Sequence, residues 1–141
     1  MSDERPCTTS RFYVKFGGET QGVFTEASGL QVELDMTEYR EGGNNSFTYR
    51  FPGPARFSNL SLKRGIVRKN DFYTWFKEII DGNFKPKNVS LIMYDEAGKE
   101  VLTWDFTNAY PVKWIGPEFQ VSPAELAIET LELAYEGMTL Q

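Results

Sequence analysis

The residue types that support enzyme chemistry are scarce in this sequence. It contains no His and a single Cys, Cys7, which excludes His-dependent nucleophiles, His-ligated metals and internal disulfides. Asp and Glu total 20, but none stands in an apolar run that would raise its pKa for acid–base work. The pairs Gly17-Gly18 and Gly42-Gly43 fit no phosphate-binding spacing. We therefore predict a protein without catalytic residues, metal or cofactor.

One basic cluster interrupts an otherwise acidic chain. Four Lys and Arg residues fall between Lys63 and Lys69, whereas the formal net charge of the chain is −5. The cluster could contact nucleic acid or form a charged corner between a strand and a helix, but the overall acidity disfavours a dedicated nucleic-acid binder. A third interpretation is that it meets an acidic patch on another copy, because such complementarity sets the register between subunits. That interpretation points to self-assembly.

The elements that would position these residues are mainly short strands. A length of 141 residues suits a single domain, 1–141. Alternating apolar and polar residues predict strands at 11–16, 23–27, 30–37, 59–64, 87–94, 101–107 and 110–114. A helix is predicted over about 70–81, with Asn70 as its N-cap, Phe72 and Trp75 on its apolar face and Gly82 as its C-terminal cap. We expect a mainly β fold, an antiparallel barrel or sandwich with one flanking helix.

The last segment fits two structures. Residues 122–125, Ser-Pro-Ala-Glu, have the pattern of a helix N-terminus, and apolar residues follow at helical spacing. Leu131, Leu133 and Tyr135 also alternate with polar residues, as in a strand. Local patterns favour the helix. In both cases Glu129 and Glu132 are expected on a solvated face.

The strand 30–37 and the stretch that follows it carry the strongest remaining pattern. The apolar residues of this strand, expected to face the core, are Leu30, Val32, Leu34 and Met36, and the polar ones, expected to face water, are Gln31, Glu33, Asp35 and Thr37. Residues 39–57 contain Gly- and Pro-rich turns and are expected to form a long extended loop or hairpin. Phe47, Tyr49 and Phe51 recur at every second position there, which a purely solvated loop would not need.

Six segments of the chain have residue patterns similar to those of one known family. In order they are FYVKF (12–16), FTEASGL (24–30), YREGGN (39–44), NLSLKRG (59–65), WDFTNAYPVK (104–113) and IETLELAYEG (128–137). Together they resemble the tail tube protein of contractile phages and of phage-tail-like injection systems, over nearly the whole chain. The resemblance implies a β-barrel or sandwich with one helix, hexameric rings, and rings stacked into a hollow tube inside a contractile sheath. It implies no catalysis and no cofactor, and it favours a strand for the last segment.

The resemblance also implies roles for particular residues. The loop 39–57 would reach a neighbouring subunit or the next ring, the N-terminal arm 1–10 would lie at a ring–ring contact, and Glu41 would face the Lys63-Arg64-Gly65 turn across an interface. The expected interface residues are Tyr39, Arg40, Glu41, Gly42, Gly43, Asn44, Phe47, Tyr49, Phe51, Lys63, Arg64 and Gly65. The polar row Gln31, Glu33, Asp35 and Thr37 is expected to line the lumen, where DNA or protein cargo would slide.

The expected partners are other copies of the chain, a sheath protein, baseplate or tube-initiator proteins, and cargo. The charged N-terminus has no secretory pattern and no long apolar run follows, so we expect no signal peptide and no membrane anchor. The resemblance implies synthesis in the bacterial cytoplasm and assembly into a phage tail or tail-like particle. Two other classes stay open: a small ligand-binding barrel enzyme, which would need a buried titratable residue, and a soluble carrier or adaptor whose rings do not stack. Within the family, the alternative is a protein that caps the tube or joins it to the baseplate.

Overall fold

Strands dominate the computed structural model, which describes residues 11–40, 48–66, 71–119, 121 and 127–141. The elements within these ranges are β1 (Arg11–Phe16), β2 (Glu19–Val23), β3 (Glu26–Ser28), β4 (Val32–Arg40), β5 (Thr48–Phe57), β6 (Leu60–Gly65), α1 (Asp71–Ile80), β7 (Lys87–Tyr94), β8 (Glu100–Ile115), β9 (Ile128–Ala134) and β10 (Gly137–Leu140). The predicted fold class, mainly antiparallel β with one helix, is confirmed.

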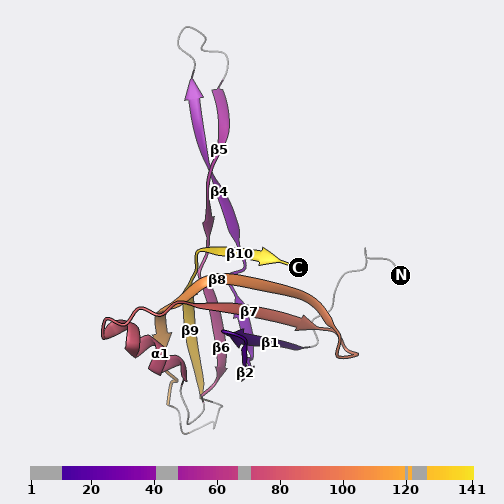
Figure 1. The fold of residues 1–141 in the computed structure, drawn as a ribbon, viewed down its shortest axis with the longest axis vertical. Coiled ribbons are helices and arrows are strands. Elements are labelled where there is room, and N and C mark those ends of the chain that lie inside the picture. Colours follow the sequence, from indigo (N-terminus) through magenta and orange to yellow (C-terminus); the bar gives the residue numbers. More distant parts are fainter. Residues whose placement is uncertain (1–10, 41–47, 67–70, 120, 122–126) are drawn as a thin grey trace.

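Two arrays of strands enclose the core. Eight strands form one antiparallel sheet in the order β2-β1-β7-β8-β9-β6-β3, with β10 pairing with β8. In Figure 1, β1, β7 and the first part of β8 run across the view, whereas β6 and β9 run along the longest axis. Strands that cross in this way form the two layers of a partly open barrel, and their inward faces meet between the layers.

The long strand β8 connects the two layers. It spans 16 residues, pairs with β7 up to Ala109, and pairs with β9 from Tyr110 onward. At Asn108 the backbone has a φ of 50°, a conformation that Asn tolerates better than most residues. The prediction of two separate strands, 101–107 and 110–114, is therefore wrong in detail, because the chain passes between layers without leaving the sheet.

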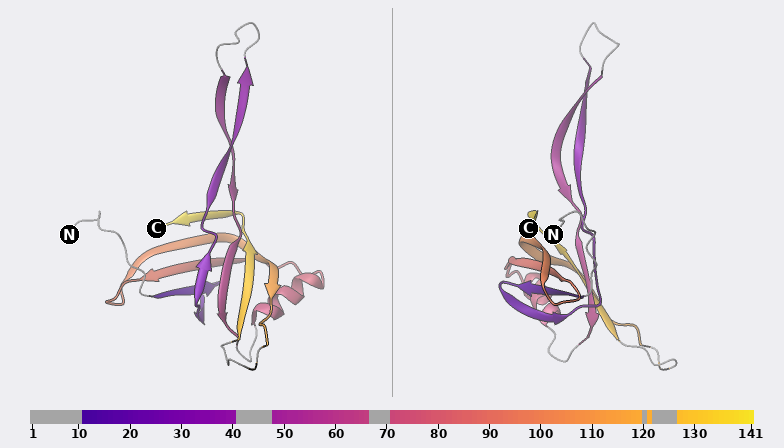
Figure 2. Two further views of the ribbon diagram at one scale, coloured as in Figure 1. Left: turned by 180° about the vertical axis from the view of Figure 1, so that it is seen from behind. Right: turned by 90° about the vertical axis from the view of Figure 1, so that its right-hand side faces the viewer.

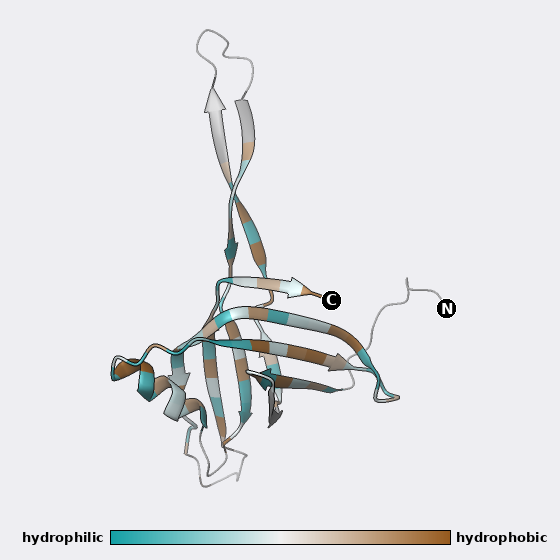
Figure 3. Cartoon of the chain, viewed as in Figure 1, coloured by the Kyte–Doolittle hydropathy of each residue, from teal (hydrophilic) through white to brown (hydrophobic). Residues whose placement is uncertain are grey.

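The core is built from the faces that the alternation predicts. Its buried members are Val14, Phe16, Phe24, Leu60, Leu62, Phe72, Trp75, Val89, Leu91, Phe106, Ala109, Leu131 and Leu133. The apolar face of α1 closes one end, where the rings of Phe72 and Trp75 pack at a tilt against Phe16, with centroid distances of 5.2 Å and 5.4 Å. Figure 3 shows β7 as a largely apolar strand, in agreement with its contribution to this core.

Several predicted boundaries are confirmed and others shift. Strands 11–16 and 87–94 and the helix lie where they were expected, and Gly82 ends the helix with a φ of 95°. The last segment is a strand from Ile128 onward, while Asn70 and residues 122–125 lie outside the described residues. The predicted strand 23–27 is divided between two strands, β2 and β3, because the chain bends at Thr25, after the buried Phe24.

Gly29 lies in the short connection between β3 and β4, where the backbone comes very close to a neighbouring segment. Its φ is 92°, and a Cβ at this position would overlap the backbone carbonyl oxygen of Asn59. Gly82 has a similar φ of 95°, but a Cβ there would meet no atom within 4 Å. Both positions need the left-handed backbone, and only Gly29 also needs the missing side chain.

We predict that Gly29→Ala destabilises the protein more than Gly82→Ala. The left-handed conformation alone costs a non-glycine residue roughly 1–2 kcal/mol, and at Gly29 the steric overlap adds to that cost. Urea unfolding of the two variants measures the difference in the free energy of unfolding. Equal losses would show that the connection can relax around a side chain.

Candidate subunit interface

The β4–β5 hairpin projects from the body along the longest axis of the molecule (Figures 1 and 2). β4 and β5 form a separate two-stranded sheet. Four apolar side chains in and just before β4 are exposed, and we call them the hairpin row: Leu30, Val32, Leu34 and Met36. Leu34 is 59% and Met36 64% exposed. The expectation that this row faces the core is wrong for Val32, Leu34 and Met36, because within the described residues no second layer covers the ribbon.

The two faces of the hairpin carry different apolar residues, and its pairing shifts register along its length. The pairing of β4 with β5 shifts between Leu34 and Met36, and past the shift Phe51 lies opposite Thr37. Residues directly opposite one another share a face, and consecutive residues alternate between faces. Phe51, which is exposed, therefore lies on the face opposite to the hairpin row. The hairpin row therefore continues past the shift to Met36 on one face, and Phe51 adds an apolar side chain to the face that carries Glu33 and Asp35.

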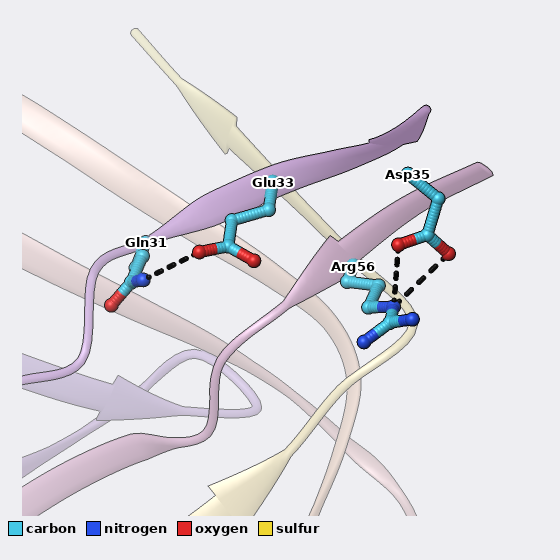
Figure 4. A network of polar contacts seen from close by, with 4 residues as sticks. All are labelled: Gln31, Glu33, Asp35 and Arg56. Carbon is cyan, nitrogen blue, oxygen red and sulfur yellow. Dashed lines mark hydrogen bonds and ion pairs between the residues drawn. The ribbon is translucent and has the colours of Figure 1, made fainter. Parts of the chain in front are cut away.

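The polar residues expected to line the lumen lie in β4, except Gln31, which directly precedes it, and their charges are partly compensated. Figure 4 shows Gln31 donating from Nε2 to Glu33 Oε1 at 3.3 Å, and Arg56 Nε 2.9 Å from Asp35 Oδ1. The guanidinium of Arg56 offsets the charge of Asp35, so Glu33 supplies the net negative charge of this group. Thr37 belongs to β4, but its side chain lies outside the described residues.

The root of the hairpin is fastened to the body at several points. The Ser58 amide donates to the Gln31 carbonyl at 3.1 Å, and the Tyr135 hydroxyl donates to the Ser58 carbonyl at 2.7 Å. The Tyr135 ring also packs between Phe57 and Phe106, with centroids 5.7 Å and 4.8 Å away. Burial raises the pKa of Tyr135 above its ordinary value. These contacts join the hairpin to β9 and to the core.

For most of the expected interface residues near the end of the hairpin, the side chains lie outside the described part of the structure. Tyr39 and Arg40 lie in β4 and pair with Tyr49 and Thr48 of β5. Glu41, Gly42, Gly43, Asn44 and Phe47 lie outside the described residues. Of the segment 39–57, expected to be a long extended loop or hairpin, the described residues form the end of β4 and the whole of β5, as in a hairpin.

Arg64, expected at a subunit interface, is buried inside the protomer. Its Nε lies 3.1 Å from Oε1 of Glu129, and the two side chains are 6% and 0% exposed. The guanidinium carbon sits 3.7 Å from the ring centroid of Phe72, so the pair lies directly beneath α1. Within the protomer Lys63 pairs instead with Glu26, at 3.2 Å. Lys63-Arg64-Gly65 is therefore the end of β6 and not a turn, and the cluster does not form one exposed basic patch.

Glu129 also corrects the sequence interpretation, which placed it on a solvated face. Glu129 lies on the same face of β9 as the buried Leu131 and Leu133. Arg64 lies on the same face of β6 as Leu60 and Leu62. The register pairs Arg64 directly with Glu129. The alternation already carried this signal, and two opposite charges at core positions of two strands would have identified the pair.

The described residues offer little for catalysis. An apolar cavity of about 170 Å³ is lined by Phe12, Ala27, Leu30, Leu91, Met93 and Trp104, which include no titratable side chain. Within the described ranges no group of three or more Asp, Glu, Cys or His residues is placed to hold a metal ion. Across the same residues, no helix has the length and apolarity to cross a membrane.

We predict that the Arg64–Glu129 pair behaves as a buried unit. Arg64→Met or Glu129→Leu alone leaves a charge in the core and should cost about 3–5 kcal/mol, whereas the double variant should lose much less than the sum. Lys63→Met is the control, because its exposed pair with Glu26 is worth about 1 kcal/mol or less. A double-mutant cycle in urea measures the coupling. Additive losses would contradict the prediction.

Comparisons with known proteins agree with this architecture. The family model described as T4-like virus tail tube protein gp19 matches residues 8–139. No curated protein matches the chain.

Solved structures resemble the chain over almost its full length. One, titled as the PVC sheath–tube complex of an extracellular contractile injection system in the extended state, has a TM-score of 0.87 at 27% identity and covers 99% of this chain and 93% of that one. Another, the anti-feeding prophage tube-terminating cap, has a TM-score of 0.87 at 31% identity, covering 100% and 94%. Hcp1 from Flavobacterium johnsoniae shares the fold, with a TM-score of 0.58 at 15% identity and coverage of 92% and 94%. Because the family model spans nearly all of the sequence, this chain belongs to the family of T4-like virus tail tube proteins.

Proposed function

We propose that this tube protein forms hexameric rings that stack into the hollow inner tube of a contractile tail or injection system. The observation that carries the proposal is the projecting hairpin, whose apolar row is exposed although its root is fastened to the core. A contiguous exposed apolar surface on a small protein is typical of an interaction site. The proposed role is structural and needs no catalytic group.

The hairpin is the proposed subunit contact. The hairpin carries Phe51 on the face of Glu33 and Asp35, and it offers the hairpin row on its other face to a neighbouring copy. Its tip, with Glu41 to Phe47, and the N-terminal arm 1–10 would extend those contacts to a further copy. Edges of the sheet at β2 and β3 would add main-chain pairing between copies.

The proposed partners follow from the similar structures. Those structures are titled as a sheath–tube complex, a tube-terminating cap and a baseplate. We infer that this tube contacts a sheath on its outside and a baseplate at one end, and that the particle is assembled after synthesis in the bacterial cytoplasm. A terminal-ring subunit is the second candidate, since one similar structure is that of a cap. Long tubes formed from this chain alone would favour the repeated subunit.

We predict that Leu34→Glu/Met36→Glu abolishes tubes and leaves a folded protein, because both side chains are exposed in the protomer and would become buried only on assembly. Ile80→Glu is the matched control, since Ile80 at the end of α1 is 66% exposed. Electron microscopy of concentrated protein shows whether tubes form, and circular dichroism shows whether the variant is folded. Normal tubes from the double variant would refute the role of the hairpin row.

We further propose that Gln31, Glu33 and Asp35 face the lumen. Glu33→Lys should preserve tubes and impede DNA or acidic protein cargo, because a cation in every copy would hold anions that the native wall repels. Glu96→Lys, in the exposed turn between β7 and β8, makes the same charge change elsewhere. Cargo delivery by the assembled particle measures the effect. If particles with Glu33→Lys deliver cargo as well as the control, the proposal that this row lines the lumen is contradicted.

A further inference from the structure

A second exposed apolar surface lies at the end of the molecule opposite the hairpin. The first part of the connection from β8 to β9, residues 116–119, leads toward that end (Figure 2). Two large apolar side chains in this connection, Phe119 and Val121, are 90% and 96% exposed. Side chains this exposed gain nothing from the fold of their own protomer, so the fold does not account for them.

The ends of three strands extend this surface. Ile115 ends β8 and lies opposite Thr130, and Ile128 begins β9 opposite Gly65 at the end of β6. The amide of Ile66 donates to the Ala127 carbonyl at 2.9 Å, which holds the end of β6 beside the start of β9. The exposed apolar residues at this end, which we call the distal patch, are Ile66, Ile115, Phe119, Val121 and Ile128.

The two apolar surfaces differ in shape and lie at opposite ends of the longest axis. The hairpin row is a linear strip on a rigidly rooted ribbon, whereas the distal patch combines strand ends with residues of the connection from β8 to β9. Two different surfaces cannot form a self-complementary two-fold contact with each other. They are suited to a heterologous, head-to-tail contact, which continues as a stack when it does not close.

We propose that the distal patch of one copy packs against the hairpin row of a copy in the adjacent ring, with Phe119 and Val121 as its anchors. This inference rests on the proposed tube function and names the second half of its stacking contact. A copy of the same chain is the fitting partner because it carries the complementary apolar strip at the opposite end. Stacking then covers both surfaces in every copy except those in the terminal rings.

The test uses Phe119→Asp/Val121→Asp, with Ile80→Asp as the control. Both changed residues lie in an exposed connection, so the variant should fold and form rings of native size, and the concentration needed for tubes should rise by about tenfold or more. The variant keeps its hairpin row, so a small amount added to native protein should shorten native tubes by capping one end. A variant that also carries Leu34→Glu/Met36→Glu should not cap them.

The outcomes separate this inference from the proposed function. Tubes of native length from Phe119→Asp/Val121→Asp would overturn the inference and leave the tube function standing. Loss of rings as well as tubes would assign the patch to contacts within a ring, and tubes that fail only to bind sheath would assign it to the sheath; each overturns the inference. Native protein that forms neither rings nor tubes, even on a baseplate, would refute the proposed function and the inference with it.

Discussion

A ribbon two strands wide cannot bury its own apolar face, and much of this protein's behaviour follows from that constraint. The body satisfies the rule by crossing two layers of strands and closing one end with α1. The hairpin has no such cover, so the alternation that makes β4 a strand also leaves Leu34 and Met36 in water. An apolar face of this kind is stabilised only by another molecule, which is why an isolated protomer is an incomplete unit of the proposed tube.

Several contacts hold the root of the hairpin to the body. These contacts are one backbone hydrogen bond, from Ser58 to Gln31, and the packing and hydrogen bond of the Tyr135 side chain, which reaches from the end of β9 into the core. Below it, the Arg64–Glu129 pair joins β6 to β9 and supports the ring of Phe72 on α1. A buried ion pair adds little net stability over apolar residues, but it tolerates few alternative arrangements, so it favours one register of these strands.

Much of the fold was predictable because its signals are local. Period-two alternation located β1 and β7, and the helical stripe with its glycine cap located α1. The family resemblance then chose a strand for the last segment against a local helix signal. The hairpin was anticipated as an extended arm with an apolar side, but neither its register shift nor the opposite face of Phe51 could be read from spacing, because both depend on pairing with β4.

By itself, the sequence determined the fold class, the absence of His-based chemistry and the family, since these depend on composition, periodicity and ordered motifs. The tertiary structure alone decided which apolar faces are covered. Leu34 and Leu133 occupy similar alternating patterns, yet one is exposed and the other buried. It also decided that Arg64 and Glu129 neutralise each other in the core. The reason is the same in both cases: alternation specifies that a strand has two faces, and only the packing of layers specifies which face meets protein and which meets water.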